Sequence, residues 1–224
     1  MMPLIFFALL ALLYFPSQVM ATEKVSVLAL EYPPYTSQQS EDLGISFVAL
    51  RNKLAPLGVE PEAIFLPPAR AGMHMESREW CFSFYPPNIK SDNYQFIQLD
   101  SKPIALSFYR WRQPEVFDWQ ALNELAGLRV AMLRSFNKGG LYKVMLEAGL
   151  EVIDVNSLSQ GFSFLAKRRV DLVFADEYGG AYIMAQLGMD VEKVQFAQTP
   201  LTETFLHVWG NSKCLAAKRL AASG

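Results

Sequence analysis

The chain has 224 residues, 51% of them hydrophobic, with a formal net charge of −2 and an isoelectric point near 5.8. This length can bury one large core or two small ones. The near-neutral balance excludes the strongly basic surface with which proteins bind nucleic acid, so we expect no nucleic-acid partner. A small charged ligand would have to be held by local side chains and not by an overall field.

The first 21 residues have the pattern of an export signal. Leu4 to Phe15 is an apolar run with the length of a signal-peptide core, and it is too short to cross a bilayer. Val19-Met20-Ala21 fits a small-residue cleavage site. We therefore expect cleavage after Ala21 and a mature protein in the periplasm. No Lys or Arg precedes the apolar run, which leaves an uncleaved anchor or a misassigned start codon as the alternatives.

Cysteine and histidine are scarce, which limits the possible chemistry. The chain has two cysteines, Cys81 and Cys214, and two histidines, His74 and His207. An even cysteine count permits a disulfide in an exported protein, with two buried free thiols as the alternative. Their spacing excludes a CxxC redox or zinc motif, and the histidines lie far apart in sequence. We expect no metal site, no cofactor and no catalytic residues.

Strands and helices alternate in the first half of the chain. Residues 24–30 alternate apolar and polar positions and predict a strand, and the prolines of Tyr32-Pro-Pro-Tyr35 predict a rigid turn after it. The next predicted elements are a helix over 43–57, a strand over 62–66, a helix that opens at 67–72 and a strand over 80–85.

The second half continues this alternation. It predicts a strand over 104–111, a short helix within 117–127 with Asp118 as its N-cap, a strand over 128–133, a helix over 138–148 and a strand over 151–155. A helix capped by Ser157 or Ser159 then ends near Arg169, and the last elements are a strand over 170–175, a helix over 177–187 and strands over 194–197 and 204–209. The βαβ order predicts parallel sheets with right-handed crossovers.

The elements divide into two α/β lobes. We expect lobe one to span 22–107 plus 208–224, and lobe two to span 108–207. The chain passes between them twice in strand-like segments, which suits a hinge that closes the lobes on a ligand. Cys81 on the third strand of lobe one and Cys214 in the returning tail would then lie in the same lobe, where a disulfide would join the tail to the sheet.

Polar residues follow two of the buried strands directly. Ser135, Phe136 and Asn137 come after the strand over 128–133, and Asp176 and Glu177 after the strand over 170–175. Ligands of open α/β sheets bind in the crevice outside the carboxyl ends of the strands, so these residues predict a ligand cleft. Exposed N–H groups at the following helix can bind an anion. The alternative is that Asn137 and Asp176 only cap helices.

Four motifs in this order resemble one family. They are Tyr32-Pro-Pro-Tyr35, Pro-Pro-Ala-Arg-Ala at 67–71, Leu125-Ala-Gly-Leu-Arg-Val130 and Val170-Asp-Leu-Val-Phe-Ala-Asp176. The chain resembles the periplasmic solute-binding proteins of family 3, the amino-acid-binding group of ATP-binding-cassette importers. The resemblance implies an α/β protein with the two-lobed type II periplasmic-binding fold, two mixed, mostly parallel sheets and a two-strand hinge.

The resemblance also implies a function. The protein would capture a small polar solute, such as an amino acid, in the cleft between its lobes, and would catalyse no reaction. An inner-membrane permease or sensor would recognise the closed form, and we expect a monomer. In the family an acid at the position of Asp176 accepts the ligand's α-ammonium, and an arginine usually holds the carboxylate where Lys90 stands. Lysine supplies the charge without the planar fork of arginine.

Five further residues are candidates for the cleft, each with a structural alternative. Tyr32 and Tyr35 would form an aromatic wall, or else cover the edge of the core. Arg70 stands in the first turn of its helix, where a cation is unfavourable, so an anionic ligand would explain it; otherwise it is a solvated surface residue. Ser83 and Tyr85 alternate with Cys81 along the strand over 80–85, so we expect the three to share a face, and they match ligand-contacting positions of the family.

Two other functions fit the same fold. One is a dehydratase-like enzyme, with Asp176 or Glu177 as a general acid in the cleft. The other is a receptor that signals to a membrane sensor without any transport. The fold alone does not separate these functions from solute capture.

Overall fold

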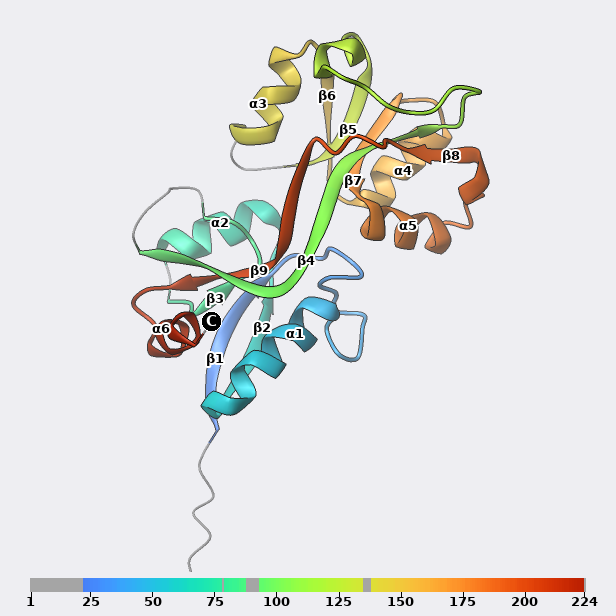
Figure 1. Ribbon diagram of the computed structural model, residues 1–224. Coiled ribbons are helices and arrows are strands. Elements are labelled where there is room, and N and C mark those ends of the chain that lie inside the picture. Colours follow the sequence, from blue (N-terminus) through green and yellow to red (C-terminus); the bar gives the residue numbers. More distant parts are fainter. Residues whose placement is uncertain (1–21, 78, 88–92, 135–137, 224) are drawn as a thin grey trace, which may run out of the picture.

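The computed structural model describes residues 22–77, 79–87, 93–134 and 138–223, and it has two halves joined by two long strands (Figure 1). The first elements are β1 (Glu23–Ala29), α1 (Ile45–Leu54), the 3-10 helix η1 (Ala55–Leu57), β2 (Val59–Phe65), α2 (Pro68–Ser77), β3 (Phe82–Ser83) and β4 (Tyr94–Trp111). They are followed by η2 (Leu122–Leu125), β5 (Arg129–Leu133), α3 (Gly140–Glu147), β6 (Glu151–Val155), α4 (Leu158–Ala166), β7 (Leu172–Asp176), α5 (Glu177–Gln186), η3 (Val191–Lys193), β8 (Val194–Phe196), β9 (Thr202–Asn211) and α6 (Leu215–Ala222).

The strands of the described residues form one mixed sheet of nine strands. Its order is β2-β1-β3-β9-β4-β7-β5-β6, and β8 also pairs with β4. β1 is parallel to β2 and β3, and β5 is parallel to β6 and β7. The α/β class is confirmed, but the expectation of two separate sheets is wrong. β4 is 18 residues long, so it pairs with β9 in one half and reaches β7 in the other, which fuses the two parallel groups.

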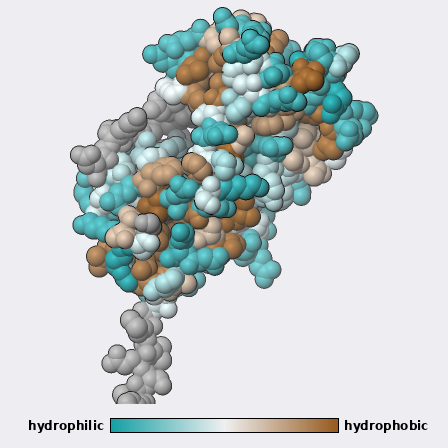
Figure 2. Space-filling view, in the orientation of Figure 1, coloured by the Kyte–Doolittle hydropathy of each residue, from teal (hydrophilic) through white to brown (hydrophobic). Residues whose placement is uncertain are grey.

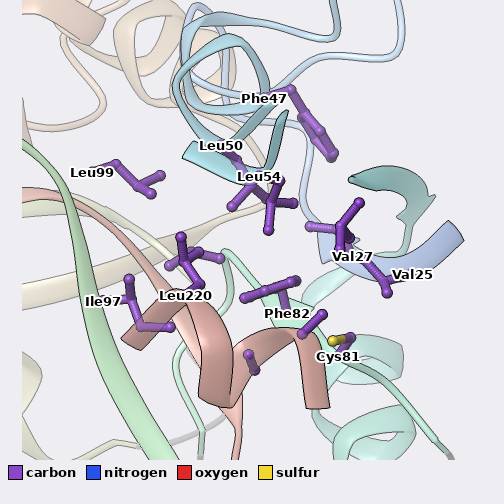
Figure 3. Close-up of a cluster of buried hydrophobic side chains, with 14 of the residues drawn as sticks. Val25, Val27, Phe47, Leu50, Leu54, Cys81, Phe82, Ile97, Leu99 and Leu220 are labelled. Carbon is purple, nitrogen blue, oxygen red and sulfur yellow. The ribbon is translucent and has the colours of Figure 1, made fainter. Parts of the chain in front are cut away.

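Helices cover both faces of the sheet in each half. In the half that contains β1, the core beside α1 and α6 includes Phe47, Leu50 and Leu220, and Figure 3 shows Cys81 in this same cluster. α2 covers the opposite face through Ala71 and its neighbours. In the other half, α4 and α5 pack on one face and α3 on the other. Each half therefore has its own cores, and the predicted lobe boundaries after residues 107 and 207 fall inside β4 and β9.

Several predicted elements differ from the observed ones. β3 covers two residues and not six, because the Ser83 hydroxyl accepts a hydrogen bond from the amide of Tyr85 and turns the chain out of the sheet. The short helix expected within 117–127 is η2, but its N-cap is Ala121 and not Asp118, whose carboxylate accepts hydrogen bonds from the Thr199 hydroxyl and the Trp119 amide. Three features were not predicted: α6, η3 and the first ten residues of β4.

Other local predictions are confirmed. Ser157 is the N-cap of α4, since its hydroxyl accepts the amide of Gln160 at 3.1 Å. The first helix and η1 end at Gly58, whose φ of 68° is left-handed. On the face shown in Figure 2, hydrophilic residues surround small hydrophobic patches on both halves. Among the described residues, no helix is long and apolar enough to cross a membrane, and no cluster of metal-ligating side chains occurs.

Candidate functional site

A hollow opens between the two halves at the carboxyl ends of two pairs of parallel strands, β1 with β2 and β5 with β6. We call it the outer hollow. It has a volume of about 480 Å³. Glu31 and Leu66 line it from the ends of β1 and β2, and Arg134 and Asn156 line it from the ends of β5 and β6. Crevices of this kind are where α/β proteins bind ligands. None of the described residues that the sequence singled out as site candidates lines this hollow.

The turn after β1 is fixed to the start of α1. The amides of Ile45 and Ser46, which begin the helix, donate to the carbonyls of Pro34 and Tyr35 at 3.1 and 2.9 Å. Gly44 precedes them with a φ of 95°, and a Cβ there would lie 2.5 Å from the Tyr35 carbonyl oxygen. The close approach therefore requires glycine. The result is a rigid turn that presents two tyrosine side chains toward the other half.

Asp176 accepts a hydrogen bond on its carboxylate from each of the two tyrosines. It is the last residue of β7 and the N-cap of α5, and only 2% of it is exposed. Its Oδ1 accepts the hydroxyl of Tyr35 at 2.7 Å and the amide of Gly179 at 2.6 Å, and its Oδ2 accepts the hydroxyl of Tyr32 at 3.2 Å. Side chains more than 140 positions apart thus meet at one carboxylate, which joins the two halves.

The electrostatics of this group keep the tyrosines protonated. Burial raises the pKa of Tyr32 well above its ordinary value, and the nearby charge of Asp176 and the hydrogen bond to it raise it further. The same causes, in the same order, raise the pKa of Tyr35. Tyr109 supports the group from β4: its hydroxyl donates to the Glu177 carbonyl at 2.7 Å, and burial raises its pKa. Tyr32 and Tyr35 are therefore permanent donors to Asp176 at physiological pH.

Asp176 also lines a second cavity, the inner hollow, of about 350 Å³. Tyr32, Tyr35 and Phe84 line it from the first half, and β4 and β9 contribute residues that include Phe205 and His207. The Nδ1 of His207 lies 2.6 Å from the Phe205 carbonyl, and the ring stacks on Phe96 with 4.3 Å between ring centroids. Burial lowers the pKa of His207, and its hydrogen bond opposes this only in part.

Ser83 and Tyr85 are buried and line neither hollow. The Ser83 hydroxyl donates to the Tyr85 carbonyl at 2.7 Å and accepts the Tyr85 amide at 3.1 Å. Tyr85 packs with Leu28 and Trp80 in the core beneath α2. Cys81 belongs to the core on the other side of the sheet, so these three residues do not share one face. A ligand role for Ser83 and Tyr85 stays a prediction.

Arg70 and Glu177 are exposed. Arg70 lies in the first turn of α2, as expected, and its amide bonds the carbonyl of Pro67, which lines the outer hollow. Glu177 follows Asp176 but faces a third hollow, on the flank between α1 and α5, together with Tyr178. It therefore lies apart from the cluster of Asp176, Tyr32 and Tyr35, which we call the Asp176 group. Lys90, Ser135, Phe136 and Asn137 lie outside the described residues, so their roles stay predictions.

The sequence reasoning missed several residues of the two hollows. Arg134 and Asn156 each follow a parallel strand directly, which is the same signal that singled out Ser135, so both could have been found. His207 gave no such signal. It reaches the inner hollow because β9 passes through both halves, and no local pattern predicts that path.

The predicted disulfide is present. Cys81 and Cys214 are bonded, with their Cα atoms 5.2 Å apart. Cys214 is the residue before α6 and Cys81 is the residue before β3, so the bond ties the C-terminal tail to the start of β3, as the lobe assignment implied.

Comparisons with known proteins agree with this geometry. No family model and no curated protein matches the sequence. Among solved structures, the ligand-binding core of GluR0 from Nostoc punctiforme in complex with L-glutamate matches with a TM-score of 0.67 and 16% identity, over 89% of this chain and 90% of that chain. Holo ArgBP from T. maritima matches with a TM-score of 0.66 and 14% identity, over 89% and 88%.

A third structure is an arginine transport system periplasmic binding protein from Legionella pneumophila. It matches with a TM-score of 0.66 and 11% identity, over 90% of this chain and 92% of that chain. At these identities the shared property is the fold, and the matches extend over almost the whole length of each protein. The chain therefore has the type II periplasmic-binding fold of the amino-acid-binding proteins, as its four motifs implied.

Proposed function

We propose that the protein is a periplasmic substrate-binding protein that captures a small polar solute, such as an amino acid, between its two halves for transport. It catalyses no reaction and works as a monomer, and a membrane permease or sensor recognises its closed form. Lobe one comprises 22–107 plus 208–224, lobe two comprises 108–207, and residues 1–21 are a signal peptide. The observation that carries this proposal is the carboxylate of Asp176, which is buried at the meeting point of the halves and reached by Tyr32 and Tyr35.

The site supports binding better than catalysis. Asp176 accepts hydrogen bonds from two phenols and one amide, so its oxygens are arranged as acceptors, which is how a binding site receives a ligand N–H. The structural neighbours include the GluR0 ligand-binding core in complex with L-glutamate and ArgBP with bound arginine. A ligand with an ammonium group suits the same oxygens here.

Lys90, Arg70 and residues 135–137 complete the proposed site. Lys90 would hold the ligand's carboxylate as a point charge, and Arg70 would contribute positive charge at the mouth of the cleft. Exposed amides near Asn137 would add donors for the same carboxylate. Ser83, Tyr85 and Glu177 are also part of the proposed site; the first two are buried, and the third faces the flank hollow.

A thermal-shift screen tests the proposal. The full chain would be expressed, purified and heated with amino acids, small carboxylates, polyamines and sugars. A ligand that binds only the folded protein raises the melting temperature, so we expect a rise with at least one amine-bearing compound. Asp176→Asn should abolish this rise and still cap α5, because Asn and Asp are equally good N-caps.

Asp190→Asn is the matched control, because Asp190 caps η3 away from both hollows. It should keep the full rise. A folded protein that responds to no compound in the screen, or an Asp176→Asn variant that responds like wild type, would contradict the proposal. Mass spectrometry of the exported protein should find a mature chain that starts at Thr22.

A further inference from the structure

We propose that the ligand of the inner hollow is an ammonium compound with an apolar, ring-sized body, such as an aromatic amino acid or the corresponding amine. The ammonium would lie against Oδ2 of Asp176, and the body would fill the rest of the hollow. This inference rests on the proposed function and narrows its ligand class.

The first argument is the charge of the site. Asp176 is almost fully buried, and its partners are two phenol hydroxyls and a backbone amide. Among the described residues, the ion pairs involve other carboxylates, and none brings a lysine or arginine to Asp176. Buried carboxylates are rarely left without a cation. A cationic ligand would supply the missing charge.

The second argument is the free capacity of one oxygen. Each carboxylate oxygen can accept about two hydrogen bonds. Oδ1 already has two, from Tyr35 and Gly179, whereas Oδ2 has one, from Tyr32. Oδ2 is therefore the position for a ligand N–H. The rings of Tyr32 and Tyr35 are stacked 5.8 Å apart beside it, and the faces of aromatic rings attract ammonium groups.

The third argument is the wall of the inner hollow. Beyond Asp176 it is formed mainly by apolar and aromatic side chains, among them Phe84, Pro86, Leu106 and Phe205. Its only other titratable side chain among the described residues, apart from the two tyrosines, is His207, and burial lowers the pKa of that ring. His207 is therefore neutral near pH 7 and does not repel a cation.

This wall selects against polar ligand bodies. A cavity of about 350 Å³ is at the small end of the range for ligand sites and can hold one aromatic ring. Apart from Asp176 and its two tyrosines, the described lining offers no charged side chain to the guanidinium of arginine or the side-chain carboxylate of glutamate, only the hydroxyls of Thr36, Ser46 and Thr204 and the ring of His207. Burying either charge there is therefore unfavourable. The inner hollow should thus prefer phenylalanine to the arginine and glutamate that its structural neighbours bind.

Calorimetric titration of the full chain tests this inference. The probes are phenylalanine, phenethylamine, hydrocinnamate, arginine and glutamate. We expect phenylalanine and phenethylamine to bind at least tenfold more tightly than hydrocinnamate, which lacks the ammonium, and than arginine or glutamate. Asp176→Asn should weaken phenylalanine and phenethylamine at least tenfold.

Phe205→Ala is a second variant, because it removes an exposed wall side chain and leaves the cores intact. It should weaken phenylalanine several-fold, whereas Phe164→Ala, on α4 and outside the hollow, should not. Preferential binding of arginine or glutamate, or equal binding of hydrocinnamate, would overturn the inference and leave solute capture standing. A failure of every compound in the wider screen would remove the proposed function as well.

Discussion

Removal of the Cys81–Cys214 disulfide should be strongly destabilising, and the structure sets the magnitude. The two residues are 133 positions apart. Closing a loop of that length removes about 17 cal/mol/K of entropy from the unfolded chain, which is about 5 kcal/mol at 25 °C. For a protein of this size each kcal/mol shifts the melting temperature by about 2–4 °C, so the loss should reach about 10–20 °C.

The variant to make is Cys81→Ala with Cys214→Ala. Alanine suits both places, because Cys81 is buried in an apolar core and a serine at 214 would add an N-cap to α6 that the native chain lacks. Thermal unfolding followed by circular dichroism gives the melting temperature. Wild-type protein in reductant should melt at nearly the same temperature as the double variant.

The single variants decide the mechanism. If the cross-link acts on the unfolded chain, either single change removes it entirely, and each single variant should be about as unstable as the double variant. Two single effects that add up to the double effect would mean that the side chains stabilise by packing alone. A fall of less than about 3 °C in the double variant would refute the entropic reasoning altogether.

Three further predictions follow from the site and its supports. Burial lowers the pKa of His207 below its ordinary 6.5, so the unfolded chain binds a proton at a higher pH than the folded protein does. The stability that depends on the neutral ring is therefore present above pH 6.5 and is lost as the pH falls. The melting temperature of wild type should drop more between pH 7 and pH 5 than that of His207→Phe. Gly44→Ala should lower the free energy of unfolding, measured in urea, by about 3 kcal/mol or more, because the added Cβ would overlap the Tyr35 carbonyl. Gly58→Ala is the control: its Cβ would lie in open space and only the left-handed φ is unfavourable, so the loss should be about 1–2 kcal/mol. Tyr109→Phe removes the hydrogen bond to the Glu177 carbonyl and should lower the free energy of unfolding by about 1 kcal/mol in the same assay. An unchanged urea midpoint would show that this bond does not stabilise the folded protein.

Local patterns predicted the parallel βα units well, because their strands are short, buried and bounded by turns or caps. β5, β6 and β7 begin and end within two residues of the predicted bounds. Only the second part of β4, from residue 104 onward, was predicted. Its first part carries polar and charged side chains such as Gln98 and Asp100, and the register against β9 shifts between Gln98 and Pro103. A strand with such a pattern is held by its partner β9, and a partner more than 90 residues away has no local signature.

The same limit applies to the site. Each member of the Asp176 group stood out by its own local signal: two tyrosines flanking prolines, and an acid after a buried strand. Their meeting could not be predicted, because it depends on how the two halves lie relative to each other, and that is fixed by β4 and β9 together. The motifs therefore predicted which residues to examine, and the structure was needed to bring them to one carboxylate.

The path of β9 has a consequence for how the protein is made. β9 supplies the neighbour of both β3 and β4, and α6 behind it closes the core around Phe47 and Leu50. A ribosome therefore releases the first half of the sequence long before that half can complete its own sheet. Under the proposed export, the first half would therefore stay incompletely folded until the last strand emerges, and an incompletely folded polypeptide can be threaded through a membrane.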